Sequence, residues 1–146
     1  MKLSATYNIP APRERVFDAL TDPAMLCRCI EGCEMFSVQE DGTYHARLCV
    51  GIGSIKGNFT GIARMTDVNP PETYTLNVDG RGGPGFVIGS ARMRLAPEGE
   101  ATTLSCDADV NVGGMIAAVG SRLVAVAAKR MMDRFFEALA REMAAG

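Results

Sequence analysis

The most regular pattern of apolar positions lies between Gly113 and the C-terminal residue. Apolar residues recur there every three or four positions, the spacing of one helix face, namely Ile116, Val119, Leu123, Ala127, Met131, Phe135, Leu139 and Met143. A second row beside it widens the stripe and comprises Gly120, Val124, Ala128, Met132 and Phe136. We therefore expect a helix about 45 Å long whose apolar face is too broad to remain in water. The preceding chain is predicted to cover that face.

The chain before this helix alternates between apolar and polar residues, which is typical of half-buried strands. The predicted strands span residues 2–9, 35–39, 44–50, 55–65, 74–78, 86–95 and 102–112. Turn signals such as Glu40-Asp41-Gly42 and Asn69-Pro70-Pro71 separate them. Two short helices are expected after the first strand, one from Pro12 to Leu20 and one that Asp22-Pro23 caps.

These elements predict one α+β domain over residues 1–146. An antiparallel sheet of about seven strands would wrap around the long C-terminal helix, with the two short helices inserted after the first strand. A chain of 146 residues suits a single domain, and no linker or internal repeat divides it.

Charge and composition narrow the function classes. The net charge of −2 leaves no basic surface of the kind that nucleic-acid binding requires. No run approaches 18 apolar residues, and the N-terminal residues lack the apolar run of a signal peptide. We therefore expect a cytoplasmic protein whose five cysteines are reduced thiols. The chain from Ser121 onward contains five basic residues and three acidic ones. This excess of positive charge predicts either a solvated helix face or contact with an anionic surface.

The candidates for catalysis and metal binding are weak. His45 is the sole histidine, so a nucleophile–histidine system would depend on it alone. Cys27, Cys29 and Cys33 lack the second pair that structural zinc requires. We predict no metal, no catalytic residue and no enzymatic activity.

Two further motifs have ordinary structural interpretations. Gly80-x-Gly82-x-x-Gly85 matches the dinucleotide fingerprint in spacing, but it lies between two predicted strands and contains Pro84, so a rim loop or turn is expected. Asp107 and Asp109 lie two apart on one strand and are predicted to be solvated on its outward face.

Small residues are concentrated where the helix should meet the sheet. Ala117, Ala118, Ala125 and Ala128 mark the first half of the helix, and Gly57, Gly61, Ala63 and Ala108 lie on the predicted inner faces of strands. Such residues permit either close contact between helix and sheet or an apolar cavity for a lipophilic ligand. A cavity would be lined by Phe59, Gly61, Phe86, Gly89, Ala91, Met93, Val119, Leu123, Ala127 and Met131.

A series of short motifs runs almost from end to end of the chain. They are Ile9-Pro10-Ala11-Pro12-Arg13, Asp22-Pro23, Gly32-Cys33-Glu34, Val50-Gly51, Lys56-Gly57-x-Phe59-x-Gly61, Pro70-Pro71-Glu72-x-Tyr74-x-Leu76, Gly82-Gly83-Pro84-Gly85-Phe86, Val112-Gly113-Gly114 and Gly120-Ser121-Arg122-Leu123. In these motifs the chain resembles the CoxG-like family of carbon monoxide dehydrogenase subunits. In its order of elements it resembles the START/Bet v 1-like (SRPBCC) superfamily, which has the helix-grip fold.

The resemblance implies an accessory protein of a carbon monoxide dehydrogenase-like molybdenum hydroxylase that carries a lipophile such as a quinone. Two features depart from the family. Ile30-Glu31-Gly32-Cys33 stands where Ile-Pro-Gly-Cys is common, and the chain ends at Gly146 without the C-terminal extension that members recruited to membranes often carry. Association with the inner membrane face is therefore expected to lack an anchor in this chain.

Three functions remain open from the sequence. The first is a non-enzymatic protein that holds an apolar ligand, with no cofactor besides such a lipophile. The second is a ligand-free module that docks an enzyme or a membrane through its basic helix. The third is a cyclase-like enzyme of the same superfamily, which would need a polar group inside the cavity.

Overall fold

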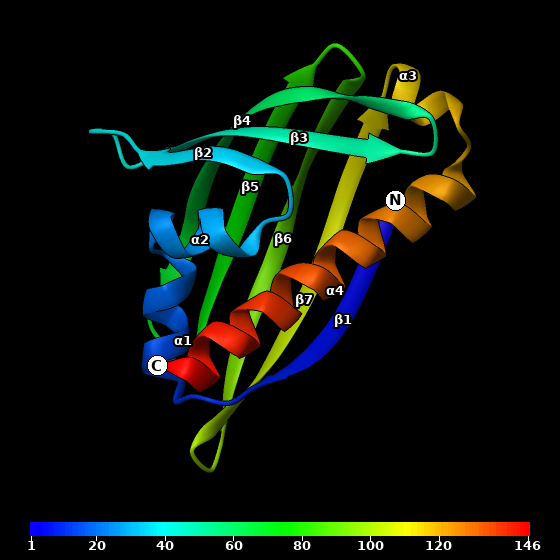
Figure 1. Cartoon of the computed structure of the whole chain (residues 1–146). Helices are drawn as coiled ribbons and strands as arrows, with labels where there is room; N and C mark the ends of the chain where they lie inside the picture. The colour runs from blue at the N-terminus through cyan, green and yellow to red at the C-terminus, as the bar shows by residue number, and fades with distance from the viewer.

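A seven-stranded antiparallel sheet and a long C-terminal helix make up most of the molecule (Figure 1). The computed structural model describes residues 1–146. The strands are β1 (Lys2–Ile9), β2 (Cys33–Val38), β3 (Tyr44–Ile52), β4 (Ile55–Asn69), β5 (Thr73–Gly82), β6 (Gly85–Glu98) and β7 (Ala101–Gly113). The helices are α1 (Arg13–Leu20), α2 (Pro23–Cys29), α3 (Met115–Ala118) and α4 (Ser121–Ala145).

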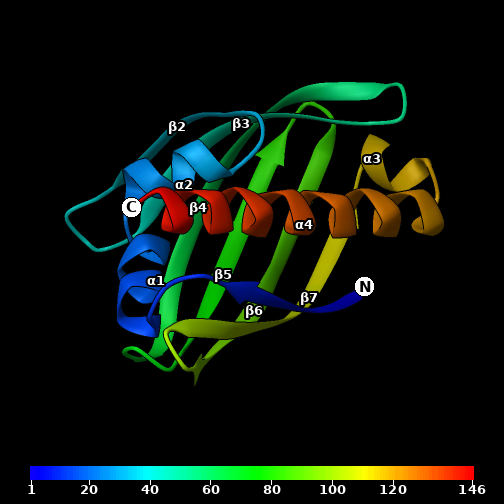
Figure 2. The same ribbon diagram turned by 60° about the horizontal axis from the view of Figure 1, so that its bottom comes forward.

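The first strand of the chain pairs with the last strand. In space the strands follow the order β1-β7-β6-β5-β4-β3-β2, so β1 closes the sheet against β7 while the remaining strands form a meander. The sheet curves around α4, which crosses its concave face from the β3–β4 hairpin towards α1 and α2 (Figures 1 and 2). The α+β architecture predicted from the sequence is confirmed.

The two short helices form where the sequence predicts them. In α1, Val16 and Leu20 are buried one helical turn apart against the sheet. The Asp22 side chain accepts a hydrogen bond from the amide of Ala24 and so caps α2, with Pro23 in the first turn. Both helices lie at the end of the molecule where α4 terminates (Figure 1).

The C-terminal helix differs from its prediction because it is interrupted. Gly120 adopts a φ of 103°, which ends the short α3 and starts α4 in a new direction. The continuous helix of about 45 Å expected from Gly113 is therefore wrong. The 25 residues of α4 span about 37 Å, and Val119 lies at the end of α3 instead of within the long helix.

The glycine-rich segment around residue 80 is a tight turn between paired strands. β5 and β6 remain paired up to Gly82 and Gly85, so only Gly83 and Pro84 form the connection. An added Cβ at Gly82 would lie 2.0 Å from the carbonyl oxygen of Asn58, so only glycine fits there. The predicted turn is confirmed, and the wide rim loop is not found.

The densest part of the core occupies one end of the molecule. Leu104 on β7 and Leu139 on α4 are fully buried there, together with Ile9, Val16 and Leu20. The Thr102 hydroxyl is buried with them and donates to the carbonyl oxygen of Ala11. None of the helices is both long enough and apolar enough to pass through a bilayer.

Candidate functional site

Strand pairing decides which residues face α4. On β6, Val87, Gly89, Ala91, Met93 and Leu95 share one face because side chains alternate along a strand. Neighbouring strands add residues of the same face through their register, among them Leu48, Val50, Phe59, Gly61, Ala63, Val78, Ala108, Val110 and Val112. We call this surface the concave face. The set contains no charged side chain.

The two halves of the concave face are packed differently. At the end near α1, Met93 and Cys106 are 5% exposed and pack with Phe136 and Leu139 of α4. Towards the β3–β4 hairpin, Val78, Val87 and Val110 are only half-buried, although α4 crosses the sheet. The first half of α4 presents alanines such as Ala127 and Ala128, whose short side chains do not seal the apolar strand residues from solvent.

The room around the glycines of the concave face shows whether small residues there allow close contact with another element or leave space. A Cβ at Gly57 would lie 2.6 Å from Pro84 Cγ, so Gly57 permits close contact with the β5–β6 turn. A Cβ at Gly61 would meet nothing nearer than 3.9 Å. The answer therefore differs by position: the β5–β6 turn fills the space above Gly57, whereas a Cβ at Gly61 would make only ordinary contacts with β5 and none with α4.

A groove of about 360 Å³ opens between the β3–β4 hairpin and α4. Val50 and Ile52 form its hairpin wall, and Leu123, Ala127 and Met131 form its helix wall. Leu123 reaches the hairpin tip, where its Cδ2 would lie 3.5 Å from a Cβ on Gly53. We call this depression the hairpin groove, and its walls are mostly apolar, as lipophile-binding sites are.

Charged residues bridge one edge of the hairpin groove. The Arg134 guanidinium donates to both carboxylate oxygens of Glu31 at 2.7 Å and so connects α4 to the loop between α2 and β2. Arg28 on α2 pairs with Glu142 near the end of α4. Arg130 also lines the groove but has no ion-pair partner. It is therefore a free hydrogen-bond donor at the rim.

Most of the residues predicted to bind a ligand lie on the concave face or along the hairpin groove. Phe59, Gly61, Gly89, Ala91 and Met93 are on the concave face, although Met93 belongs to the densely packed end. The α4 residues predicted for the site, Leu123, Ala127 and Met131, line the hairpin groove.

The prediction that Phe86 lines the cavity is wrong. It is paired with Arg81 and Gly113 on the opposite face of the sheet. The Arg81 guanidinium carbon lies 5.9 Å from the centre of its ring. A Cβ at Gly113 would lie 2.3 Å from ring atoms of Phe86. The phenyl ring therefore packs directly on the backbone of Gly113, on the outer face of the sheet.

The hairpin wall of the groove and its charged edge were not predicted from the sequence. Val50 follows the strand alternation and could have been found from it. Ile52 lies beyond the predicted strand of residues 44–50, Glu31 lies in a loop, and Arg130 lies on α4 itself. No local pattern relates these three residues, because the fold of the hairpin over the helix brings them together.

Titratable groups on β1 and α4 are joined by a hydrogen bond and an ion pair. The Tyr7 hydroxyl donates to Asp133 at 2.7 Å, and burial, followed by that hydrogen bond, raises the pKa of Tyr7. Lys129 pairs with the same carboxylate at 2.6 Å, and these two partners lower the pKa of Asp133. His45 lies on the face of β3 opposite the buried Tyr44 and Ala46.

The fold brings together no cluster of side chains that could bind a metal ion. No group of three or more His, Cys, Asp or Glu side chains is arranged to hold a metal ion. Cys106 lies on the concave face, but within its packed end, where burial raises the pKa of its thiol to about 11. The chemistry that this arrangement supports best is the binding of an apolar molecule.

Known proteins share both the sequence pattern and the geometry. A family model that describes the CoxG subunit of carbon monoxide dehydrogenase matches residues 6–144. No curated protein gives a sequence match. The crystal structure of a conserved protein from Geobacillus kaustophilus is 34% identical, with a TM-score of 0.93 over 99% of this chain and 95% of that one.

More distant structures share the fold. A START superfamily protein from Mycobacterium smegmatis has a TM-score of 0.72 at 19% identity, covering 97% of this chain and 96% of its own. The Zhui aromatase/cyclase from Streptomyces has a TM-score of 0.73 at 16% identity, covering 98% and 93%. The predicted helix-grip, START-like fold is confirmed.

Proposed function

The chain belongs to the CoxG family of carbon monoxide dehydrogenase subunits, and we propose that it is a non-enzymatic protein that carries a lipophilic molecule. The ligand would lie between the concave face and the first half of α4, and it would pass through the hairpin groove. In this proposal the protein works in the cytoplasm beside a carbon monoxide dehydrogenase-like molybdenum hydroxylase. The family description supports the association with carbon monoxide dehydrogenase.

The observation that carries the proposal is the apolar, incompletely filled half of the concave face. Apolar strand residues such as Val78, Val87 and Val110 stay half-buried there, next to a groove of about 360 Å³. Pockets for small molecules are typically about 300–1,000 Å³ and mostly apolar. Unfilled apolar surface is unfavourable in water, so a hydrophobic ligand would stabilise this half of the molecule.

A quinone suits the distribution of polar groups. The concave face offers an uncharged surface for an apolar tail. The unpaired Arg130 at the groove rim offers donors to a carbonyl oxygen of the ring. Any lipophile with an apolar body and one acceptor group would match these walls, and a quinone is the member of that class that we propose.

The experiment that tests the proposal enlarges one wall of the groove. Leu123 is 41% exposed, so Leu123→Trp fills the groove with little overpacking, and the melting temperature should stay within a few degrees of wild type. Affinity for a short-tailed quinone or a hydrophobic fluorescent dye should fall at least tenfold, or about 1.4 kcal/mol. Titration fluorimetry and thermal melts measure the two effects.

Ile62→Trp is the matched control. Ile62 is 46% exposed and pairs with His45 on the outer face of the sheet, away from the groove. This change should leave dye affinity unaltered. Equal losses in both variants, or a wild-type protein that binds neither probe and carries no lipophile in native mass spectrometry, would contradict the carrier function.

A second function is favoured by the outer face of α4. Val126 is 60% exposed beside Arg122 and Arg130, so apolar and basic groups share one accessible surface. This surface suits a module that docks an enzyme or an anionic membrane without a ligand. Arg122 does not line the hairpin groove, so Arg122→Glu should then weaken co-sedimentation with the enzyme or with anionic vesicles and leave dye affinity unaltered.

A further inference from the structure

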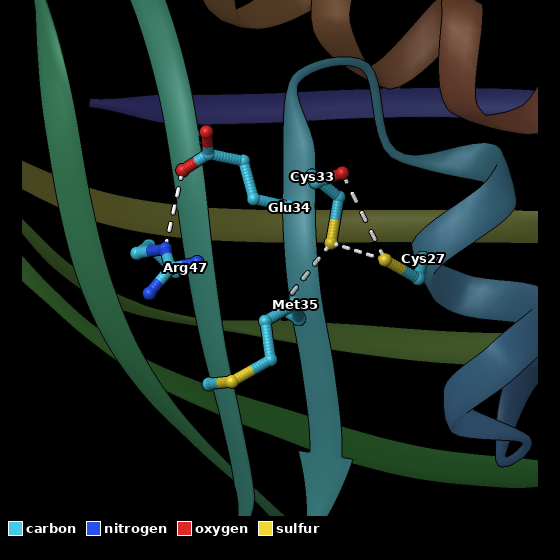
Figure 3. A network of polar contacts seen from close by, with 5 residues as sticks. All are labelled: Cys27, Cys33, Glu34, Met35 and Arg47. Atoms are coloured by element: carbon cyan, nitrogen blue, oxygen red, sulfur yellow. Dashed lines mark hydrogen bonds and ion pairs between the residues drawn. The ribbon is translucent and has the colours of Figure 1, made fainter.

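Two of the five thiols lie close together at the junction of α2 and β2 (Figure 3). The Cys27 thiol donates to the sulfur of Cys33, and the two Sγ atoms are 3.0 Å apart. The Cys33 thiol in turn lies 3.4 Å from the carbonyl oxygen of Met35. A disulfide requires sulfur atoms about 2.05 Å apart, so a shift of about 1 Å would bring these two within bonding distance.

The backbone holds the two cysteines in this arrangement. Cys27 lies in the last turn of α2 and Cys33 is the first residue of β2. The amide of Cys33 donates to the carbonyl oxygen of Ile30, which reverses the chain between them. Gly32, with a φ of 83°, accepts from the amide of Cys49 and leaves no room for a side chain. The thiol pair is therefore positioned by the fold.

The other cysteines are separate from this pair. Cys29 is 4% exposed and Cys106 is 5% exposed, both within the packed core. Cys49 has no thiol contact. Cys27 and Cys33 are half-buried, so a small oxidant can reach them.

We propose that Cys27 and Cys33 form a redox-active pair that a peroxide converts into an intramolecular disulfide, which restrains the loop between α2 and β2. The Cys27 sulfur attacks one peroxide oxygen, the O–O bond breaks, and the departing hydroxide takes the Cys27 proton as water, which leaves a sulfenic acid at Cys27. The Cys33 sulfur then attacks the Cys27 sulfur. The S–S bond forms, the S–O bond breaks, and the departing hydroxide takes the Cys33 proton as water. One peroxide thus oxidises two thiols and yields two waters.

The environment of the pair assigns the order of attack. Burial raises the pKa of Cys33 to about 12, with the neighbouring Cys27 as a further cause. Cys33 therefore stays protonated and acts second, as the resolving thiol. A thiol that stays protonated is a poor nucleophile, so the first attack on the oxidant falls to Cys27.

The disulfide would act on the edge of the hairpin groove. The ring that it closes contains Glu31, whose carboxylate pairs with Arg134 of α4 at 2.7 Å. A restrained loop holds Glu31 in one position and so keeps this ion pair formed. The redox state of the thiols would therefore be transmitted to the groove, whatever molecule the groove binds.

The test uses the wild-type protein treated with one equivalent of hydrogen peroxide and then alkylated. Intact-mass analysis should find two of the five thiols lost, with full recovery after dithiothreitol. A non-reducing tryptic digest should contain residues 16–28 joined to residues 29–47, and tandem mass spectrometry should place the bond at Cys33. The melting temperature should rise by roughly 3–8 °C, and amide exchange of residues 29–33 should slow several-fold.

The control variants separate this pair from other thiol chemistry. Cys33→Ser should lose both the link and the rise in melting temperature, while Cys49→Ala should keep both. A bond from Cys27 to Cys29, disulfide-linked dimers, or a sulfinic acid at Cys27 in place of the link would overturn the proposal. Unchanged amide exchange in the oxidised protein would overturn the restraint on the loop.

Discussion

Single positions in β6 illustrate how the environment of one residue is decided. Val87 and Gly89 face α4, whereas Phe86, one residue away, is on the outer face beneath Arg81. A one-residue difference reverses the side because strand side chains alternate. The same alternation along β7 places the titratable thiol of Cys106 inside the packed end of the core.

The buried thiol of Cys106 predicts a loss of stability at alkaline pH. Burial raises its pKa from 9.0 to about 11, so between these values the folded protein retains a proton that the unfolded chain releases. The free energy of unfolding should therefore decrease as pH rises above about 9. Between pH 8 and 10.5 the decrease should be smaller in Cys106→Ala by about 1–2 kcal/mol. Urea titrations of both proteins measure this, and identical slopes would contradict it.

At the scale of elements, the break between α3 and α4 controls where the long helix begins. Gly120 has a φ of 103°, and α3 is attached to the β5–β6 turn by the hydrogen bond from the Ile116 amide to the Pro84 carbonyl oxygen. The turn, α3 and the start of α4 are thus one connected corner. Its geometry places Leu123 beside the tip of the β3–β4 hairpin and opens the groove.

A side chain at Gly120 should strain this corner. The Cβ that Gly120→Ala adds would meet no atom within 4 Å, so its effect reports only the positive φ. The free energy of unfolding should fall by about 1–2 kcal/mol. Gly83→Ala is the control, because Gly83 also meets nothing within 4 Å but has no positive φ. It should change stability by less than about 0.5 kcal/mol. Equal effects in chemical denaturation would show that the break does not depend on glycine.

For the whole molecule, the main feature is that α4 contacts two different environments. Its C-terminal half packs with α1, α2 and the strands in a dense core around Leu139. Its N-terminal half lies over strand residues that remain half-buried. Stability therefore derives mainly from one end of the molecule, and the other end is less densely packed.

Truncation of one leucine in each half of α4 should reveal this division. Leu139 is fully buried, so Leu139→Ala should lower the free energy of unfolding by about 2–5 kcal/mol. Leu123 is 41% exposed, and Leu123→Ala should lower it by less than about 1 kcal/mol. Guanidinium unfolding in the absence of ligand gives both values. Comparable large losses would mean that the helix is packed equally along its length.

Much of the fold follows from local patterns in the sequence. Strand alternation from Leu3 to Val112 and the apolar stripe of the last helix predict the α+β architecture, because burying apolar surface requires one face per element. The Asp22-Pro23 cap and the turn at Gly83-Pro84 are also local, since a few adjacent residues determine the backbone there. Five of the strand residues predicted for the site lie on the face that alternation assigns to them.

Only the tertiary structure decided how closely the concave face is packed and which residues form the charged edge of the hairpin groove. Whether small residues pack or leave room depends on what lies opposite them, which separates Gly57 beneath Pro84 from Gly61. Glu31 and Arg134 are 103 positions apart, and so no local pattern relates them. The short separation of Cys27 and Cys33 likewise became a thiol contact only through the turn between α2 and β2. Periodicity reports the side of an element that is buried, whereas distances between elements depend on packing across the whole chain.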